Sequence, residues 1–200
     1  MPQFDLRGIK AAKYVNTAGV ITYTDKTKVG DAMTANLEMR FAEGRLYAES
    51  TLAEYMRKAT GGTISIGVKY ILAAAQKLMF GSKDKARSVT YTPEGGSSST
   101  TTSFTGLVLG AKTNSGYVGI AFYAPDMIDG VEKFTCVFCH KALFGPPSMT
   151  LQTAGDTIVF NTPTTSGEFL ADDSTAQDMI EVAIVDDEAA AIAWVDAVLQ

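Results

Sequence analysis

Cys136, Cys139 and His140 form the spacing Cys-x-x-Cys-His, the motif in this chain with the clearest chemical meaning. In c-type haem attachment the two thiols bond to the haem vinyl groups and the histidine ligates the iron. A Cys-x-x-Cys pair alone is also typical of redox dithiols. Here the motif lies within Val131–Phe144, whose pattern predicts one long strand, so Cys136 and Cys139 should point to opposite faces. We therefore expect two buried cysteines that act as small apolar residues, with a redox or haem protein as the alternative from a different class.

The residue patterns that other catalytic or binding sites need are not found in this sequence. His140 is the only histidine, so neither a zinc site with several histidines nor a Ser-His-Asp triad with its own nucleophile elbow is indicated. Gly95 and Gly96 run into serines rather than the Gly-Lys-Ser/Thr of a phosphate-binding loop. The sequence thus predicts no catalytic, cofactor-binding or metal-binding residue, and we expect a protein that is not an enzyme.

The composition is that of a globular protein with material for a core: 200 residues, 46% hydrophobic and 20% charged, with frequent glycine. No apolar run reaches the roughly 20 residues that span a bilayer, and the first residues have no apolar signal core. We therefore expect the mature chain in the cytoplasm, where it is made.

The charge is divided along the chain. All 17 Lys and Arg lie at or before Lys141, whereas residues 142–200 contain acids and no bases. One interpretation is a solvated acidic face, and the other is self-association, in which the acidic end of one copy meets the basic body of another. An all-negative end does not favour direct nucleic-acid binding.

Alternating apolar residues predict a mainly β protein with minor α. Ala32–Phe41 alternates strictly, and Gly62–Val68 alternates before the period changes to that of a short helix over Ile71–Met79, ended by Gly81. A closing helix follows Asp186-Asp187-Glu188, whose acids cap its first turn. Further strands are expected within residues 6–24, at 88–92, 131–144, 157–161, 167–171 and 179–185.

One of the remaining segments is hard to assign. Residues 42–61 form an exposed excursion that is either helical, as the spacing of Glu54 and Lys58 weakly favours, or the far end of a long hairpin. Residues 82–88 are expected to be a polar loop, and Pro93–Ser103 a flexible low-complexity loop. Phe104–Ala124 is predicted to be a hairpin around residues 113–116.

In this order the features resemble a known family. The stretches GIKAAKYVNTAGVITYTDKTKVGDAMTANLEM, LYAES with GGTISIGVKYILAAAQKLMFGS, and VEKFTCVFCHKALFGPPSMTLQTAGDTIVFNTPTTSGEF are similar, in their order, to the phi13-type major tail proteins of long-tailed bacteriophages. The resemblance covers nearly the whole chain, through feature order more than through any sharp signature.

The resemblance implies a tail-tube β-sandwich or barrel flanked by one helix over residues 1–171, followed by an acidic strand-helix extension over residues 172–200. It implies a structural virion protein without cofactor, whose hexameric rings stack into a hollow conduit for phage DNA. The other tail proteins (tape measure, tail terminator and distal tail protein) would be its partners, and DNA would pass without sequence-specific binding. A membrane anchor is not expected. The tube of a contractile tail-like particle is an alternative of the same class, and a β-sandwich binding module is one of another class.

The excursion at about residues 42–61 would then be an arm that contacts neighbouring subunits. The contact residues expected on it are Tyr47, Leu52, Tyr55, Met56, Arg57 and Lys58.

Overall fold

The computed structural model describes residues 5–111, 113–150, 153 and 160–200, and these form a mainly β protein with two helices. The predicted fold class, mainly β with minor α and a C-terminal helix, is confirmed. The elements in chain order are β1 (Arg7–Thr17), β2 (Val20–Lys28), β3 (Ala32–Ala48), β4 (Thr51–Val68), α1 (Ala73–Phe80), β5 (Lys83–Tyr91), β6 (Thr100–Val108), β7 (Val118–Ile128), β8 (Val131–Phe144), β9 (Thr164–Leu170), β10 (Ile180–Val185) and α2 (Glu188–Val198).

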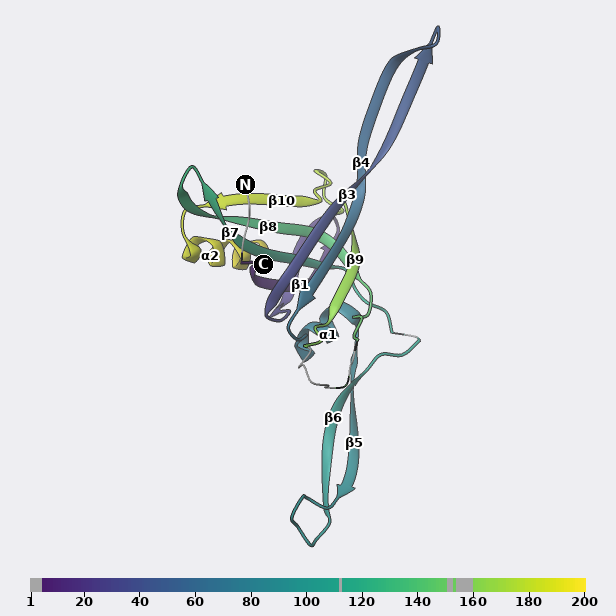
Figure 1. The fold of residues 1–200 in the computed structure, drawn as a ribbon. Helices are drawn as coiled ribbons and strands as arrows, with labels where there is room; N and C mark the ends of the chain where they lie inside the picture. The colour runs from purple at the N-terminus through teal and green to yellow at the C-terminus, as the bar shows by residue number, and fades with distance from the viewer. Residues whose placement is uncertain (1–4, 112, 151–152, 154–159) are drawn as a thin grey trace.

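Strand β8 is the branch point of the main antiparallel sheet, whose order is β2-β1-β7-β8-β9-β4-β3. One edge of β8 pairs with β7. Its other edge pairs with β10 over Phe134–Cys139 and with β9 over Lys141–Phe144. The sheet therefore divides beside β8 into two wings, one ending in β10 and the other continuing through β9 and β4 to β3 (Figure 1).

A β-bulge lies where the sheet divides. The register between β7 and β8 shifts between the pairs Val118–Ala142 and Ile120–Cys139, so β8 has one extra residue there. An extra residue exchanges the two faces of a strand. Ala142 and Phe144 consequently pack into the same core as Cys139, although an unbroken alternation would place them on the other side.

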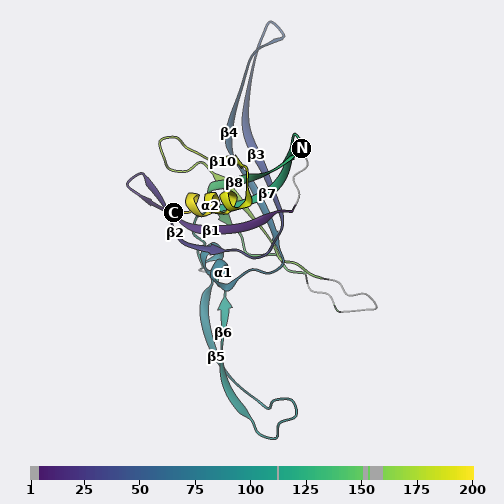
Figure 2. The ribbon, with the colours of Figure 1, turned by 90° about the vertical axis from the view of Figure 1, so that its left-hand side faces the viewer.

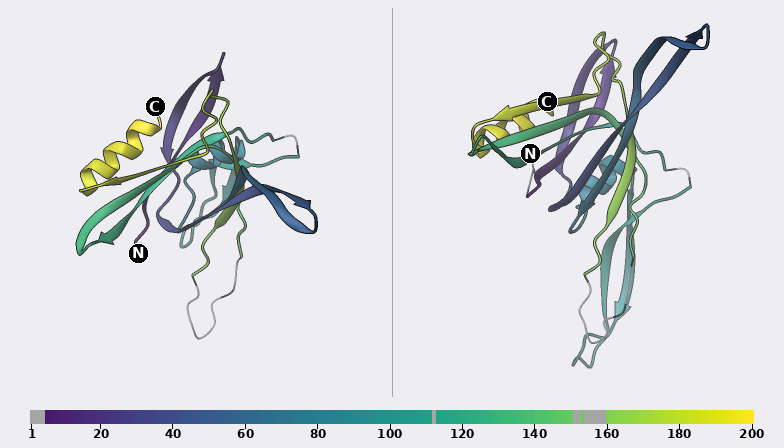
Figure 3. Two further views of the ribbon diagram at one scale, coloured as in Figure 1. Left: turned by 90° about the horizontal axis from the view of Figure 1, so that it is seen from above. Right: turned by 45° about the horizontal axis from the view of Figure 1, so that its top comes forward.

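Both faces of the β1–β7–β8 sheet are buried, each by a different helix (Figure 3). The inner core contains Cys139 and is closed by Ala75, Met79 and Phe80 of α1, which ends at Gly81 in the predicted left-handed conformation. On the outer face α2 packs Ala191, Val195 and Leu199 against a second set of buried residues, namely Ala12, Ala121, Tyr123, Phe134, Cys136 and Phe138. Asp187 caps α2 as predicted, since its Oδ1 accepts a hydrogen bond of 2.6 Å from the backbone N–H of Ala190.

Two long hairpins project from this body in opposite directions, and views a quarter-turn apart agree on this (Figures 1 and 2). One is the outer part of β3–β4, residues 41–60, which we call the arm. The other is β5–β6, whose two strands pair with each other and with no other described strand. The open choice for residues 42–61 is thus settled as a hairpin. The i, i+4 pair that favoured a helix is worth only a few tenths of a kcal/mol, less than a continuous cross-strand ladder provides.

The predicted hairpin over Phe104–Ala124 is wrong, because β6 pairs with β5 while β7 pairs with β1 and β8. Val118–Ala124 is buried throughout, as a central strand requires, whereas most of β6 is exposed. The expected polar loop at 82–88 is largely strand β5, and Thr100–Ser103 of the expected flexible loop belongs to β6. The expected strand at 157–161 falls mostly outside the described residues.

The acidic C-terminal part is joined to the basic body of the same chain. Five ion pairs make this connection: Arg7–Glu188 (2.8 Å), Lys10–Asp196 (2.7 Å), Lys26–Asp196 (3.1 Å), Lys133–Asp186 (2.9 Å) and Lys141–Asp173 (2.6 Å). Residues 172–200 therefore pack as part of the main body, and these acids meet bases within one molecule. The division of charge along the sequence, taken alone, no longer supports self-association.

This connection predicts a pH-dependent stability. The pKa of Asp196 is lowered from 3.8, first because Lys10 donates a hydrogen bond to it, while partial burial opposes the shift. The pair therefore stabilises the fold above pH 3.8 and stops doing so as the pH falls through the lowered pKa. We expect Lys10→Ala to reduce the free energy of unfolding by up to about 1 kcal/mol at neutral pH, since the pair is partly exposed, and by progressively less below about pH 3.8.

Urea denaturation at a series of pH values measures this difference. Lys13→Ala is the matched control, because Lys13 lies on the same strand and forms no ion pair with a described residue. A loss for Lys10→Ala that is the same at every pH would contradict the assignment.

Candidate functional site

The structure separates the two cysteines of the Cys-x-x-Cys-His motif, as the alternation predicts. Cys139 lies in the inner core and Cys136 in the outer core, and both are fully buried. Burial raises the pKa of both thiols, that of Cys139 to about 12. Haem attachment and dithiol exchange both need two accessible sulfur atoms on one side, so this geometry does not suit either chemistry.

His140 lies at the bulge of β8 and contacts two acids. Its Nδ1 is 3.4 Å from Asp172 Oδ2, its Nε2 is 3.9 Å from Glu181 Oε2, and its ring packs on Phe138 with centroids 4.5 Å apart. Asp172 is itself engaged, since its Oδ1 accepts hydrogen bonds from the backbone N–H groups of Ser174 and Asp178. His140 thus ties the chain before β10 to β8. Among the residues described, no group of three or more His, Cys, Asp and Glu side chains is placed to hold a metal ion.

All six predicted contact residues lie on the arm, and all six are exposed. The pairing of β3 with β4 divides them between two faces, because Gly44 is opposite Met56 and Arg45 is opposite Tyr55. Met56 and Lys58 share one face, whereas Tyr55 and Arg57 share the other. Tyr47 and Leu52 face each other at the tip, beyond a bulge in β4.

The face with Tyr55 and Arg57 is held together by its own charges and rings. The Arg57 guanidinium lies 3.6 Å from the centre of the Phe41 ring and the same distance from a Glu43 carboxylate oxygen. Arg45 lies 3.5 Å from Glu43 and 5.7 Å from the Tyr55 ring. Cross-strand contacts of this kind stiffen a two-stranded ribbon that has no third strand to support it.

The opposite face of the arm has an open hollow of about 240 Å³ at Gly44. Leu46, Met56, Glu54 and Arg45 line the hollow. A Cβ atom at Gly44 would meet nothing within 4 Å, so the missing side chain leaves this space open. Met56 is 74% exposed and Tyr47 at the tip is 61% exposed, which leaves several large apolar side chains in water.

Sequence reasoning missed two parts of this surface. Leu46 is as exposed as the residues that were named, and its signal was its place two residues from Gly44 on the same strand face. The pairing of β5 with β6 was also missed, although strands were expected at 88–92 and from Phe104 onward. The signal for the first part of β5 was that Lys85, Arg87, Val89 and Tyr91 alternate with smaller residues.

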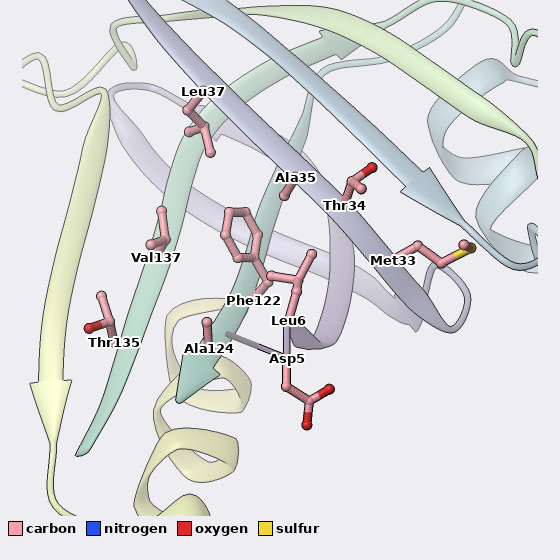
Figure 4. A pocket seen from close by; sticks show the side chains of 10 residues that line it. All are labelled: Asp5, Leu6, Met33, Thr34, Ala35, Leu37, Phe122, Ala124, Thr135 and Val137. Atoms are coloured by element: carbon pink, nitrogen blue, oxygen red, sulfur yellow. The ribbon is translucent and has the colours of Figure 1, made fainter. Parts of the chain in front are cut away.

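The main body has an apolar groove of about 480 Å³ between β3 and the β7–β8 pair (Figure 4). Leu37 and Ala35 of β3 face Val137 and Phe122 across it. The same sheet face continues past Val137 to Val182 on β10, its partner in the register, which is 59% exposed. The groove therefore opens onto an uncovered apolar strip.

Strand β10 also has an unpaired edge within the described structure, since it pairs with β8 alone. It carries one charged residue, Glu181, among Ile180, Val182 and Ile184. Exposed strand edges are usually blunted by several charges, by proline or by a covering element. An apolar edge such as this one is a template for pairing with a strand of another chain.

No known family model matches this chain, and no curated protein matches it with significant similarity. Neither helix in the described part of the chain has the length and apolar character needed to cross a membrane. What the molecule does must therefore be inferred from the arm, the second hairpin, the groove and the free edge.

The burial of both thiols makes a direct prediction. In the native protein at pH 8 neither Cys136 nor Cys139 should react with a small aromatic disulfide reagent, because the sulfur atoms are buried and the raised pKa values suppress the thiolate. Two equivalents should react after denaturation in urea, which provides the positive control. Rapid reaction of either thiol in the folded protein would restore the redox alternative.

Proposed function

We propose that this chain is a structural subunit that assembles with identical copies into a hollow tube, as the tail tube proteins of long-tailed bacteriophages do. Subunits would form six-membered rings, and stacked rings would make the conduit through which phage DNA passes without sequence-specific binding. The tape measure, tail terminator and distal tail proteins would be its partners in the virion.

The observation that carries this proposal is the pair of long hairpins that leave the body in opposite directions (Figure 1). A two-stranded ribbon is at best marginally stable alone in water, and the arm exposes apolar residues in addition. Such a segment gains stability when a neighbouring molecule covers it. Opposite projections allow one copy to contact a copy on either side, which is the arrangement an extended stack requires.

The free edge of β10 and the groove beside β3 supply lateral contacts. Pairing of β10 with a strand of a neighbour would satisfy its unpaired backbone groups and cover Val182 and Ile184. A ring of subunits joined in this way leaves no β10 edge exposed, as closure of a barrel does for its strands.

The energetic scale is adequate for assembly. Covering one exposed side chain of the size of Leu46 or Met56 contributes about 1.5–3 kcal/mol, and association costs an estimated 4–15 kcal/mol. Several such side chains per contact, repeated on each neighbour, exceed that cost. Assembly through many copies of a modest contact should therefore be steeply dependent on concentration.

Measurement of molecular mass against concentration, followed by electron microscopy, tests the proposal. We expect rings or tubes with six-fold symmetry above a threshold concentration. A variant in which a two-residue Asn-Gly turn replaces residues 43–57 joins Ala42 to its partner Lys58; it should remain folded, because no residue of either core is removed, and should fail to form tubes. A wild-type protein that stays monomeric at every concentration would refute the proposal.

The tube of a contractile tail-like particle is the alternative within this class, and it would differ by binding a surrounding sheath.

A further inference from the structure

The β5–β6 hairpin has two chemically different faces. Strand alternation and the register place Lys83, Lys85, Arg87, Val89 and Tyr91 on one face, with Phe104 directly opposite Arg87. The other face carries small polar residues, and it includes Asp84, which pairs with Lys77 of α1 at 2.7 Å. The first face, which we call the basic-aromatic face, is exposed along its length.

The three cations on this face have no counter-charge among the residues that the structure describes. Lys83, Lys85 and Arg87 form no ion pair with any described residue, although ten of the other basic side chains do so. Phe104 is half exposed beside them, and its ring lies 6.3 Å from that of Tyr91. Arginine, tyrosine and phenylalanine are among the residues enriched at protein interfaces.

The complementary surface is the outer part of the arm. Residues 46–55 contain Glu49 and Glu54 and no base, and neither acid forms an ion pair with a described residue. The hollow at Gly44 borders this part of the arm and is lined by Leu46, Met56, Glu54 and Arg45, of which Arg45 is already paired with Glu43 at 3.5 Å. A hollow of this kind accepts an aromatic ring whose neighbouring group is a cation, which is the arrangement of Phe104 beside Arg87.

We propose that the basic-aromatic face of β5–β6 docks on the acidic, apolar outer arm of a second copy of this chain. The two hairpins leave the body in opposite directions, so the contact joins different surfaces of the two copies and repeats head to tail (Figures 1 and 2). This inference rests on the proposed self-assembly and names the two surfaces that meet along the stack.

The apolar side chains on both hairpins favour a protein surface over a nucleic acid as the occupant. A polyanion would need only the cations and a stacking ring, and it would leave Val89, Leu46 and Met56 in water. Docking of hairpin on hairpin covers all of them and pairs acids with bases at the same contact.

Reversal of the charges on each hairpin tests the proposal. Lys85→Glu with Arg87→Glu, and separately Glu49→Lys with Glu54→Lys, should each raise the threshold concentration for assembly by about tenfold or more. The chain carrying all four substitutions should return to within about threefold of the wild-type threshold, because opposite charges meet again. Lys13→Glu with Lys69→Glu, a matched reversal outside both hairpins, should leave the threshold unchanged.

Filling the hollow provides a second, uncharged test. Gly44→Tyr should block docking as the reversals do while leaving thermal unfolding of the monomer unchanged, since nothing lies within 4 Å of the new Cβ atom. Gly116→Tyr is the matched control, because that position is equally open and lies on neither hairpin.

These experiments distinguish failure of the proposed contact from failure of the proposed self-assembly. A wild-type protein that never assembles would refute self-assembly itself. A wild-type protein that assembles, together with reversal variants that assemble at the same threshold, would refute this contact alone. Loss of binding to a 20-nucleotide single strand in Lys85→Glu with Arg87→Glu, with assembly unaffected, would also overturn it and identify a nucleic acid as the occupant.

Discussion

The hydrogen bonds of β8 are the constraint on which the rest of the fold depends. This one strand pairs with β7 along one edge and with both β10 and β9 along the other. The bulge after Cys139 is what allows a single strand to serve two wings, because it turns Ala142 and Phe144 onto the face that packs against α1 and β4. The outer face of the same strand receives α2. Two cores are thus built on the two sides of one strand.

This arrangement leaves both hairpins outside the two cores, so they are available for contacts with other molecules. The residues of both described cores come from the β8-centred sheet, its two helices and the segments next to them, and none comes from the outer arm or from β5–β6. Their sequences are therefore under no demand from packing within the subunit. Their apolar and charged residues are available for contacts with other molecules, as the proposed tube requires.

Local pattern was sufficient for much of the fold and for the location of the candidate contact residues. The long strand Val131–Phe144, the left-handed end of α1 at Gly81 and the cap at Asp187 follow from periodicity and from backbone chemistry over a few residues. Which strands pair with one another does not follow from local pattern. The turn signal near Asn114 suggested that its neighbours pair, but the fully buried run in β7 belongs at the centre of a sheet whose other strands lie far away in sequence. The ion pairs that join the acidic end to the body could not be predicted either, because they also connect residues far apart in the sequence.

The position of α2 has a consequence for the order of events during synthesis. Helix α2 covers an outer core whose other residues come from β1, β7 and β8, and the backbone N–H of Tyr23 donates a hydrogen bond to the backbone carbonyl of Gln200. Both hairpins and most of the sheet precede α2 in the chain, so the outer core stays uncovered until the residues of α2 have been added. A nascent chain that has not yet reached α2 therefore has no finished body from which to present its hairpins.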